Sequence, residues 1–371
     1  MNTMNAMNAM NAMRRIGILT SGGDCPGLNA VIHGVVKTAC GVYGLDVFGI
    51  LDGFNGLMPG QPVRPLVSDD VRGLLSMGGT ILGTTNRGPF DLDESGKPLP
   101  EAESAFKAVV DRAASLGLDA LIVVGGEGSL KIARAMHWMG LPVVGVPKSI
   151  DNDLAATERT FGLDTAVSVA SGALDRLHTV AIAHHRAMVC EVMGRGAGWI
   201  AISAGLASGA DAILIPEIPF RWAPLLDMIN RRRARGRNYS MIVVAEGAHP
   251  AGSDVVFQAA GRLGGIGEKV AAELAQRADV ETRVTVLGHI QRGGTPTAFD
   301  RLLASRYGEA AVHLAARGGL GRMVALRNDQ IVDVSIDEAV DLYKGVPVDG
   351  ELVRLGRSTG VYFGDEKSGG D

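Results

Sequence analysis

The sequence is poor in cysteine, in long apolar runs and in net charge. Its cysteines are Cys25, Cys40 and Cys190, an odd number without a C-x-x-C pair, which argues against disulfides and a zinc site and favours a reducing compartment. No apolar run is long enough to span a membrane. The formal net charge of -4 gives no electrostatic reason to expect nucleic acid. We therefore expect a cytoplasmic protein with neither a membrane nor a nucleic acid as partner.

Aromatic residues are also scarce, at 5%, whereas glycine is abundant, with 51 residues, and this balance indicates tight turns and close approaches of the backbone to ligands. The length of 371 residues favours two domains or one large one. Residues 1–13 repeat Met-Asn-Ala without the basic start and apolar core of a secretory signal, so we expect a disordered extension there. Both Met1 and Met13 stay open as the functional start.

The sequence is organised around residues 147–153, Pro-Lys-Ser-Ile-Asp-Asn-Asp, which follow an apolar run at 141–146 that predicts a buried parallel strand. Open α/β sheets bind their ligands beyond the carboxyl ends of strands. Lys148 can neutralise a phosphoryl group, and Asp151 can accept a proton from an attacking hydroxyl. Asp and Asn are also common turn residues, so a plain loop is the alternative interpretation.

Two units of strand, glycine turn and helix precede this stretch. Residues 21–27 (Ser-Gly-Gly-Asp-Cys-Pro-Gly) follow a strand at 16–20, and residues 125–129 (Gly-Gly-Glu-Gly-Ser) follow a strand at 118–124. Such turns direct backbone N–H groups toward a phosphate at a helix N-terminus. Glu127 in the second turn suits a magnesium ion carried by phosphates, although the helix dipole alone also favours an acid there.

Strands and helices alternate along the chain, which predicts an α/β protein with doubly wound, mainly parallel sheets. The predicted helices include 68–76, with Ser68 as N-cap, and a last helix at 336–343. The first half of the chain suits a magnesium nucleotide, and polar residues of the second half suit a phosphorylated polyol. These second-half residues are Arg186, Arg195, Glu246, Arg283, His289 and Arg292. Two such half-sites predict a phosphoryl transferase.

Five segments, in the right order and spread over almost all of 14–325, resemble the motif set of the bacterial-type 6-phosphofructokinases. They are Ser21-Gly22-Gly23-Asp24, residues 125–129, residues 147–153, Met193-Gly194-Arg195 and residues 289–294. The resemblance implies transfer of the ATP γ-phosphoryl group to the 1-hydroxyl of fructose 6-phosphate in glycolysis, with Mg²⁺ as cofactor. It also implies two doubly wound domains with the active site between them. The larger phosphoryl-donor domain would comprise 14–162 and 290–335, and the smaller sugar-phosphate domain 163–289 and 336–371.

The resemblance implies that Asp151 is the proton acceptor, that Lys148 and Arg195 share in catalysis, and that Glu127 holds the metal. The donor-binding residues that it implies are Gly23, Arg87, Gly126, Glu127, Gly128 and Ser129. The substrate-binding residues that it implies are Ser149, Ile150, Asp151, Arg186, Met193, Gly194, Arg195, Glu246, Arg283, His289, Ile290, Gln291 and Arg292. Arg186 and Arg283 would reach the sugar's phosphate from a neighbouring subunit, which implies a homodimer or homotetramer with shared active sites.

Two positions bear on the phosphoryl donor. Lys148 stands where ATP-dependent members usually have glycine, whereas Gly128 stands where pyrophosphate-dependent members usually have aspartate, a combination that resembles the mixed-substrate branch. Glycine leaves room for the α-phosphate of ATP, which a carboxylate would repel, so we expect ATP as the donor. Arg87 is offset by one position from its place in the family. His33 and Lys37 replace arginines of effector-regulated members, so we do not expect their nucleotide activation.

Two other functions stay open, as do the effectors, the use of other ketose phosphates and the choice between dimer and tetramer. One is a pyrophosphate-dependent fructose 6-phosphate 1-phosphotransferase on the same fold, which a donor assay distinguishes. The other is a non-catalytic sugar-phosphate sensor. The presence of Asp151, Glu127 and the arginines together argues against the sensor, because a sensor needs no general base.

Overall fold

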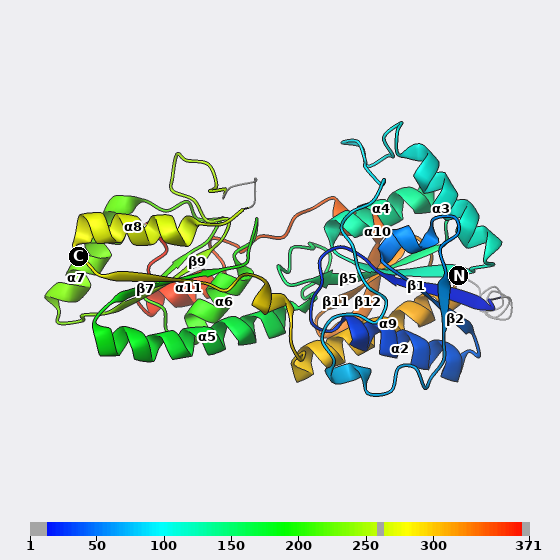
Figure 1. The fold of residues 1–371 in the computed structure, drawn as a ribbon, viewed down its shortest axis with the longest axis horizontal. Helices are drawn as coiled ribbons and strands as arrows, with labels where there is room; N and C mark the ends of the chain where they lie inside the picture. Colours follow the sequence, from blue (N-terminus) through cyan, green and yellow to red (C-terminus); the bar gives the residue numbers. More distant parts are fainter. Residues whose placement is uncertain (1–12, 258–262, 366–371) are drawn as a thin grey trace. The chain divides into compact units, whose positions relative to one another are not determined.

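The computed structural model describes residues 13–257 and 263–365, so all but Met13 of the predicted N-terminal extension lies outside the described residues. The chain forms two compact units (Figure 1). Unit 1 comprises the described chain up to Ile150, Leu154–Asp164 and Arg292–Tyr343. Unit 2 comprises Asp151–Asp153, Thr165–Gln291 and the described chain from Lys344 onward. Each unit is built on a mainly parallel sheet, which confirms the predicted α/β class.

Unit 1 contains an eight-stranded sheet with the order β12-β11-β5-β4-β1-β2-β3, and β6 pairs with β5. β3 and β12 run antiparallel to their neighbours, and the other described pairs are parallel. β4 is buried throughout, because helices cover both faces of the sheet, and this is why it reads as a continuous apolar run. The strands are β1 (Arg15–Thr20), β2 (Asp46–Ile50), β3 (Val63–Leu66), β4 (Ala120–Gly125), β5 (Val143–Ser149), β6 (Phe161–Gly162), β11 (Arg322–Arg327) and β12 (Gln330–Ser335).

Helices α3 (Glu103–Ser115), α4 (Glu127–Trp138) and α10 (Ile336–Val340) lie on one face of this sheet, and α2 (Leu28–Val42) and α9 (Ala298–Ala316) lie on the other (Figure 1). The first face forms one continuous apolar core between helices and strands. Its members include Leu121, Val123 and Val143 from the strands and Phe106, Leu130, Met136, Ile336 and Val340 from the helices. Two short 3-10 helices, η1 (Gly53–Leu57) and η2 (Leu74–Ser76), lie in the connections.

Helices α2 and α9 approach each other closely at two glycines. A Cβ atom at Gly34 would lie 2.7 Å from the carbonyl oxygen of Ser305, and one at Gly308 would lie 2.5 Å from that of Val31. Both separations are shorter than real Cβ contacts. Glycine at these two positions therefore permits the backbones of the two helices to touch.

Unit 2 contains a four-stranded parallel sheet with the order β10-β7-β9-β8. α7 and α8 cover one face, where Leu225, Ile229, Val270 and Leu274 pack against the strands, and α5 and α6 lie on the other (Figure 1). The elements are α5 (Leu163–His184), β7 (Ala187–Val192), α6 (Trp199–Ala207), β8 (Ala212–Leu214), α7 (Trp222–Ala234), β9 (Ser240–Ala245), α8 (Ile266–Ala278), β10 (Thr282–Val286), η4 (Gly288–Arg292) and α11 (Glu351–Ser358).

Three features differ from the expectations. Residues 68–76 are not a helix but turns followed by η2, and the predicted N-cap Ser68 caps nothing; Gly73, with φ of 76°, interrupts the helical path. Helix α11 was not predicted. The chain passes from unit 1 to unit 2 for the last time after Tyr343, whereas the predicted boundary lies after residue 335. The later boundary arises because α10 packs on α4 of unit 1.

Candidate active site

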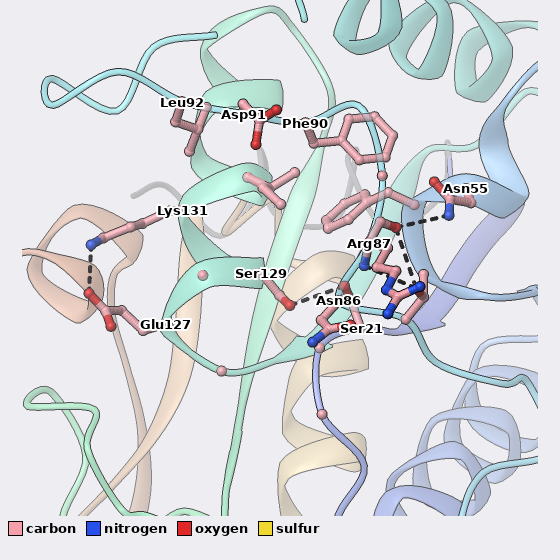
Figure 2. A pocket seen from close by; sticks show the side chains of 18 of the residues that line it. Ser21, Asn55, Asn86, Arg87, Phe90, Asp91, Leu92, Glu127, Ser129 and Lys131 are labelled. Carbon is pink, nitrogen blue, oxygen red and sulfur yellow. Dashed lines mark hydrogen bonds and ion pairs between the residues drawn. The ribbon is translucent and has the colours of Figure 1, made fainter. Parts of the chain in front are cut away.

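The first glycine turn follows β1 and is tied to the loop at 84–88. Gly22 has φ of 84°, a left-handed conformation that favours glycine. Its N–H donates to the carbonyl of Thr85 at 3.0 Å, and its carbonyl accepts from Thr84 Oγ1 at 2.7 Å. The side chain of Asn55 holds the same loop by donating to the carbonyl of Arg87 at 3.0 Å (Figure 2). The loop is thereby fixed beside the turn.

The second glycine turn leads from β4 into α4. β1 and β4 are parallel neighbours, so their carboxyl ends bring the two turns together. Ser129 Oγ of the second turn donates to Ser21 Oγ of the first at 3.0 Å (Figure 2). The start of α4 therefore faces the first turn, in the arrangement that binds phosphate groups at helix N-termini.

Lys148 brings a fixed positive charge to these turns. It lies near the end of β5, beside β4, and is only 4% exposed. Its Nζ donates to the carbonyl of Gly23. Cys25 of the same turn is fully buried, and burial raises the pKa of its thiol to about 12, so the thiol stays neutral. The ammonium group of Lys148 therefore lies at this turn beside a neutral thiol, and the Arg292 guanidinium adds a second positive charge there.

A cavity of about 420 Å³ opens beside the two turns, within the usual range of small-molecule sites (Figure 2). One part of its wall is polar and formed by the glycine turns and Lys148. Another part is apolar and is formed by Phe54, Phe90, Leu92 and Ile132. The predicted donor residues Gly23, Arg87, Gly126, Glu127, Gly128 and Ser129 all line it. The cavity thus combines a phosphate-type surface with an apolar surface.

Glu127 and Gly128 form the first turn of α4 at the cavity wall. The Glu127 carboxylate accepts a hydrogen bond from Lys131 Nζ at 2.5 Å, and both side chains are a little over a third exposed. A Cβ atom built at Gly128 would meet no atom of the described residues within 4 Å. Gly128 is helical, so neither its backbone nor its neighbours require glycine. Because Gly128 has no side chain, the space beside it in the cavity stays open.

The turn at 151–153 belongs to unit 2 and is held by Lys344. Lys344 Nζ donates to Asn152 Oδ1 at 3.1 Å, and its backbone N–H donates to the carbonyl of Asp153 at 2.9 Å. Asn152 is buried and has φ of 50°, a conformation that asparagine tolerates better than most residues. Asp151 directly precedes it and is partly buried. The direction of the Asp151 side chain therefore depends on a turn that Lys344 fixes.

We expect Lys344→Met to lower kcat about tenfold with little change in KM, because small misplacements of a reacting group are costly. The variant keeps the backbone bond to Asp153 and loses the ammonium group, which bonds Asn152 and lies 6.0 Å from the centre of the Trp199 ring. Lys344→Arg, which can still donate to the amide, should keep most of the activity. Steady-state kinetics of both variants, with thermal melting to check folding, test this prediction. Wild-type turnover in Lys344→Met would contradict it.

The acceptor-side loops predicted in the second half meet at one edge of the unit 2 sheet. They follow β7, β9 and β10, which are parallel neighbours. Buried Gln291 links two of them, since its Oε1 accepts from the N–H of Met193 at 3.3 Å. The N–H of Gly247 donates to the carbonyl of Gly194 at 3.0 Å, and this bond links the loop after β9 to the loop after β7. The structure therefore brings together Met193, Gly194, Arg195, Glu246, His289, Ile290 and Gln291.

Arg292 belongs to unit 1 instead. Its Nη1 donates to the carbonyl of Asp24 at 3.0 Å, beside the first glycine turn. Ser149 and Ile150 also lie in unit 1, at the end of β5 and directly after it. These three predicted substrate residues thus belong to unit 1, and of them Arg292 contacts the first glycine turn.

Arg186 and Arg283 lie at the opposite edge of the unit 2 sheet from the acceptor-side loops. Arg186 precedes β7, and Arg283 is the second residue of β10, so each is separated from its loop by roughly a strand's length, about 15–20 Å. Both contact the carboxylate of Glu281, at 2.8 and 2.7 Å. The bond from Arg186 holds the pKa of the Glu281 carboxyl below its usual range. The two arginines therefore share one carboxylate partner at the end of the sheet opposite the acceptor-side loops.

Sequence reasoning missed several of these residues. Lys131 and the apolar cavity wall come from helix positions and loops that carry no motif. Glu217 is another residue that sequence reasoning missed. Its carboxylate accepts hydrogen bonds from the backbone N–H groups of Gly198 at 3.0 Å and Val346 at 2.6 Å. Burial raises the pKa of this carboxyl group. Glu217 fixes the start of α6 to the C-terminal segment that carries Lys344. Its bonds are to backbone groups, so sequence pattern gives no signal for them.

No helix among the described residues is long and apolar enough to cross a membrane. The described residues also contain no group of three acidic, histidine or cysteine side chains placed to hold a metal ion by themselves.

A family model described as phosphofructokinase matches residues 15–315. The chain belongs to the phosphofructokinase family. An ATP-dependent 6-phosphofructokinase of Chloroflexus aurantiacus is 54% identical over 95% of this chain and 98% of its own length. A pyrophosphate–fructose 6-phosphate 1-phosphotransferase of Amycolatopsis mediterranei is 48% identical over 90% of this phosphofructokinase and 97% of its own length.

Solved structures support the same fold. The phosphofructokinase of Saccharomyces cerevisiae superposes with a TM-score of 0.77 at 32% identity, covering 88% of this phosphofructokinase and 45% of the yeast chain. A pyrophosphate-dependent phosphofructokinase of Nitrosospira multiformis gives a TM-score of 0.80 at 20% identity, covering 93% and 90% of the two chains, and shows the fold alone.

Proposed function

We propose that this phosphofructokinase is a glycolytic, cytoplasmic enzyme that transfers the γ-phosphoryl group of ATP to the 1-hydroxyl of fructose 6-phosphate. The products are fructose 1,6-bisphosphate and ADP. The observation that carries the choice of donor is the cavity of unit 1, where glycine turns and Lys148 adjoin an apolar wall. A nucleotide uses both surfaces, because its phosphates need N–H groups and cations while its base needs apolar contact. Pyrophosphate has no part that would occupy the apolar wall.

The residues of unit 1 fit a magnesium ion delivered with the nucleotide. Mg²⁺ usually takes one or two carboxylates and completes its shell with phosphate and water oxygens. Glu127, at the cavity wall, would be that carboxylate; with no acidic cluster to hold the ion alone in the described chain, the phosphates would supply the other ligands. When bound, the ion would neutralise charge on the phosphates.

Within this proposal, Asp151 accepts the proton of the 1-hydroxyl as that oxygen attacks the γ-phosphorus. The new bond joins this oxygen to phosphorus, and the bond that breaks leaves its electron pair on the β-phosphate of ADP. Lys148, held at the carbonyl of Gly23, neutralises the phosphoryl group during transfer. The loops with Arg195, Glu246 and Gln291 would hold the sugar phosphate.

Incubation with fructose 6-phosphate, ATP and Mg²⁺, followed by ³¹P NMR, tests this function. We expect a new phosphate ester on carbon 1 and ADP in equal amount. Binding of fructose 6-phosphate without any phosphoryl transfer from ATP or pyrophosphate would favour the sensor. The pyrophosphate-dependent phosphotransferase stays the second candidate, because Lys148 can also neutralise a phosphate leaving group.

We further propose that Arg186 and Arg283 bind the sugar's phosphate in a neighbouring subunit of a homodimer or homotetramer. Their place at the opposite sheet edge supports this. The test is complementation between two inactive variants, Asp151→Asn and Arg283→Ala, co-expressed with different tags. In a symmetric dimer of this kind, the mixed dimer has one site that lacks both residues and one site that has both. It should therefore recover about half of the wild-type activity. If the arginine acts within its own chain, both sites stay defective and no activity returns.

A further inference from the structure

Lys131 is a charged residue of the cavity wall that belongs to none of the sequence motifs. It lies one helical turn after Glu127 on α4, and its Nζ is bound to the Glu127 carboxylate at 2.5 Å. Figure 2 shows this pair on one side of α4 and Ser21, Asn86 and Arg87 on the other side of the helix. An exposed ion pair of this spacing contributes little to helix stability. The charges of this pair therefore matter more for the binding of a charged ligand in the cavity than for the stability of the helix.

A magnesium nucleotide changes the partners of this pair. The metal would draw the Glu127 carboxylate, and a carboxylate oxygen that ligates a cation accepts less well from an ammonium group. Lys131 would then lose its partner inside a cavity that holds several phosphate charges. A lysine carries three donors on a flexible four-carbon stem, so its Nζ can turn to a new anion without movement of the helix.

The position of Lys131 along α4 determines which phosphate it would meet. Gly128 and Ser129, at the start of the helix, adjoin the glycine turns. Ile132, the residue after Lys131, belongs to the apolar wall. Along the axis of α4, Lys131 therefore lies between Ser129 of the glycine turn and Ile132 of the apolar wall, and all three line the cavity. A nucleotide bound with its phosphates at the turns and its base at the apolar wall would bring its α-phosphate to this level of the helix, and pyrophosphate has no corresponding group.

We propose that Lys131 is a donor-specificity residue, which exchanges Glu127 for the α-phosphate end of the bound nucleotide and so selects ATP over pyrophosphate. This inference rests on the proposed ATP-dependent function. In this proposal, the positive charge of Lys131 favours ATP in addition to the space that Gly128 leaves open.

Equilibrium binding tests the proposal without turnover. Calorimetry would compare a non-hydrolysable ATP analogue with methylenediphosphonate, a pyrophosphate analogue, both with Mg²⁺. We expect Lys131→Met to weaken the ATP analogue by about 10- to 100-fold, the usual effect of losing a charge-assisted bond, and to change the diphosphonate less than about threefold. Lys131→Arg should keep most of the affinity. Lys107→Met, which removes the same charge from an exposed position of α3, is the matched control and should bind as the wild type does.

Each other outcome overturns the proposal. Unchanged affinity for the ATP analogue in Lys131→Met would leave Lys131 as a surface partner of Glu127 only. Equal weakening of both analogues would make it a general phosphate contact without selectivity. Failure of the wild type itself to bind the ATP analogue would instead remove the proposed function on which the inference rests. Thermal melting of each variant distinguishes any loss of folding from loss of a contact.

Discussion

Asp151→Asn should lower kcat by about 10²–10⁴-fold, the usual contribution of a general base. The substitution keeps the size of the side chain and removes its basicity. The KM for fructose 6-phosphate should change little, because proton transfer occurs in the transition state and not in the bound ground state. The turn that carries Asp151 is held by Lys344 through Asn152 and Asp153, so the proposed base has a defined backbone position.

Steady-state kinetics at several pH values would measure the effect. Asp111→Asn, which removes the same charge from an exposed position of α3, should have wild-type kcat and serves as the control. A kcat for Asp151→Asn within a few-fold of the wild type would remove Asp151 from the proposed chemistry.

Gly128→Asp should lower kcat/KM for ATP by about a hundredfold or more. A Cβ atom at Gly128 meets no described atom within 4 Å, and Gly128 lines the cavity, so we expect the new carboxylate to lie at the cavity wall. There it would lie near the phosphate chain of ATP, and like charges in a partly desolvated site cost several kcal/mol, of which each 1.36 kcal/mol is about tenfold in rate. Pyrophosphate is shorter, so its use should be affected less.

Gly128→Ala distinguishes charge from size. Its methyl group occupies the same open position, and alanine is favoured over glycine in a helix by about 0.8–1.0 kcal/mol. We expect near-normal use of ATP and a slightly higher melting temperature. An alanine variant as defective as the aspartate variant would show that volume, and not charge, limits the donor at this position.

The fold and the motif residues could be predicted because their signals are local. Apolar runs such as 120–124 mark buried strands, and the carboxyl edge of a parallel sheet is where the following residues must gather. Gly126, Glu127 and Lys148 were found in this way, and they line one cavity. The predicted roles of these residues in binding and catalysis remain predictions.

Other parts of the site depend on contacts between distant segments. Lys344 reaches Asn152 across 192 positions of sequence, and no pattern in either segment predicts that bond. Lys131 carries no signal beyond an ordinary spacing of opposite charges on a helix. The predicted helix at 68–76 was wrong. Ser68 and the acids after it are typical of a helix start, but the left-handed backbone of Gly73 interrupts the segment. Helix α11 was missed because it is short and strongly charged.

The central claim is that the cavity of unit 1 accepts ATP as the phosphoryl donor. Parallel assays of the wild-type protein with fructose 6-phosphate and Mg²⁺, offered ATP or pyrophosphate, measure kcat/KM for each donor. The open space at Gly128 and the apolar wall predict a value for ATP at least about tenfold above that for pyrophosphate, a difference of roughly 1.4 kcal/mol. Turnover with pyrophosphate and none with ATP would contradict the claim and show that Lys148 outweighs Gly128 in the choice of donor.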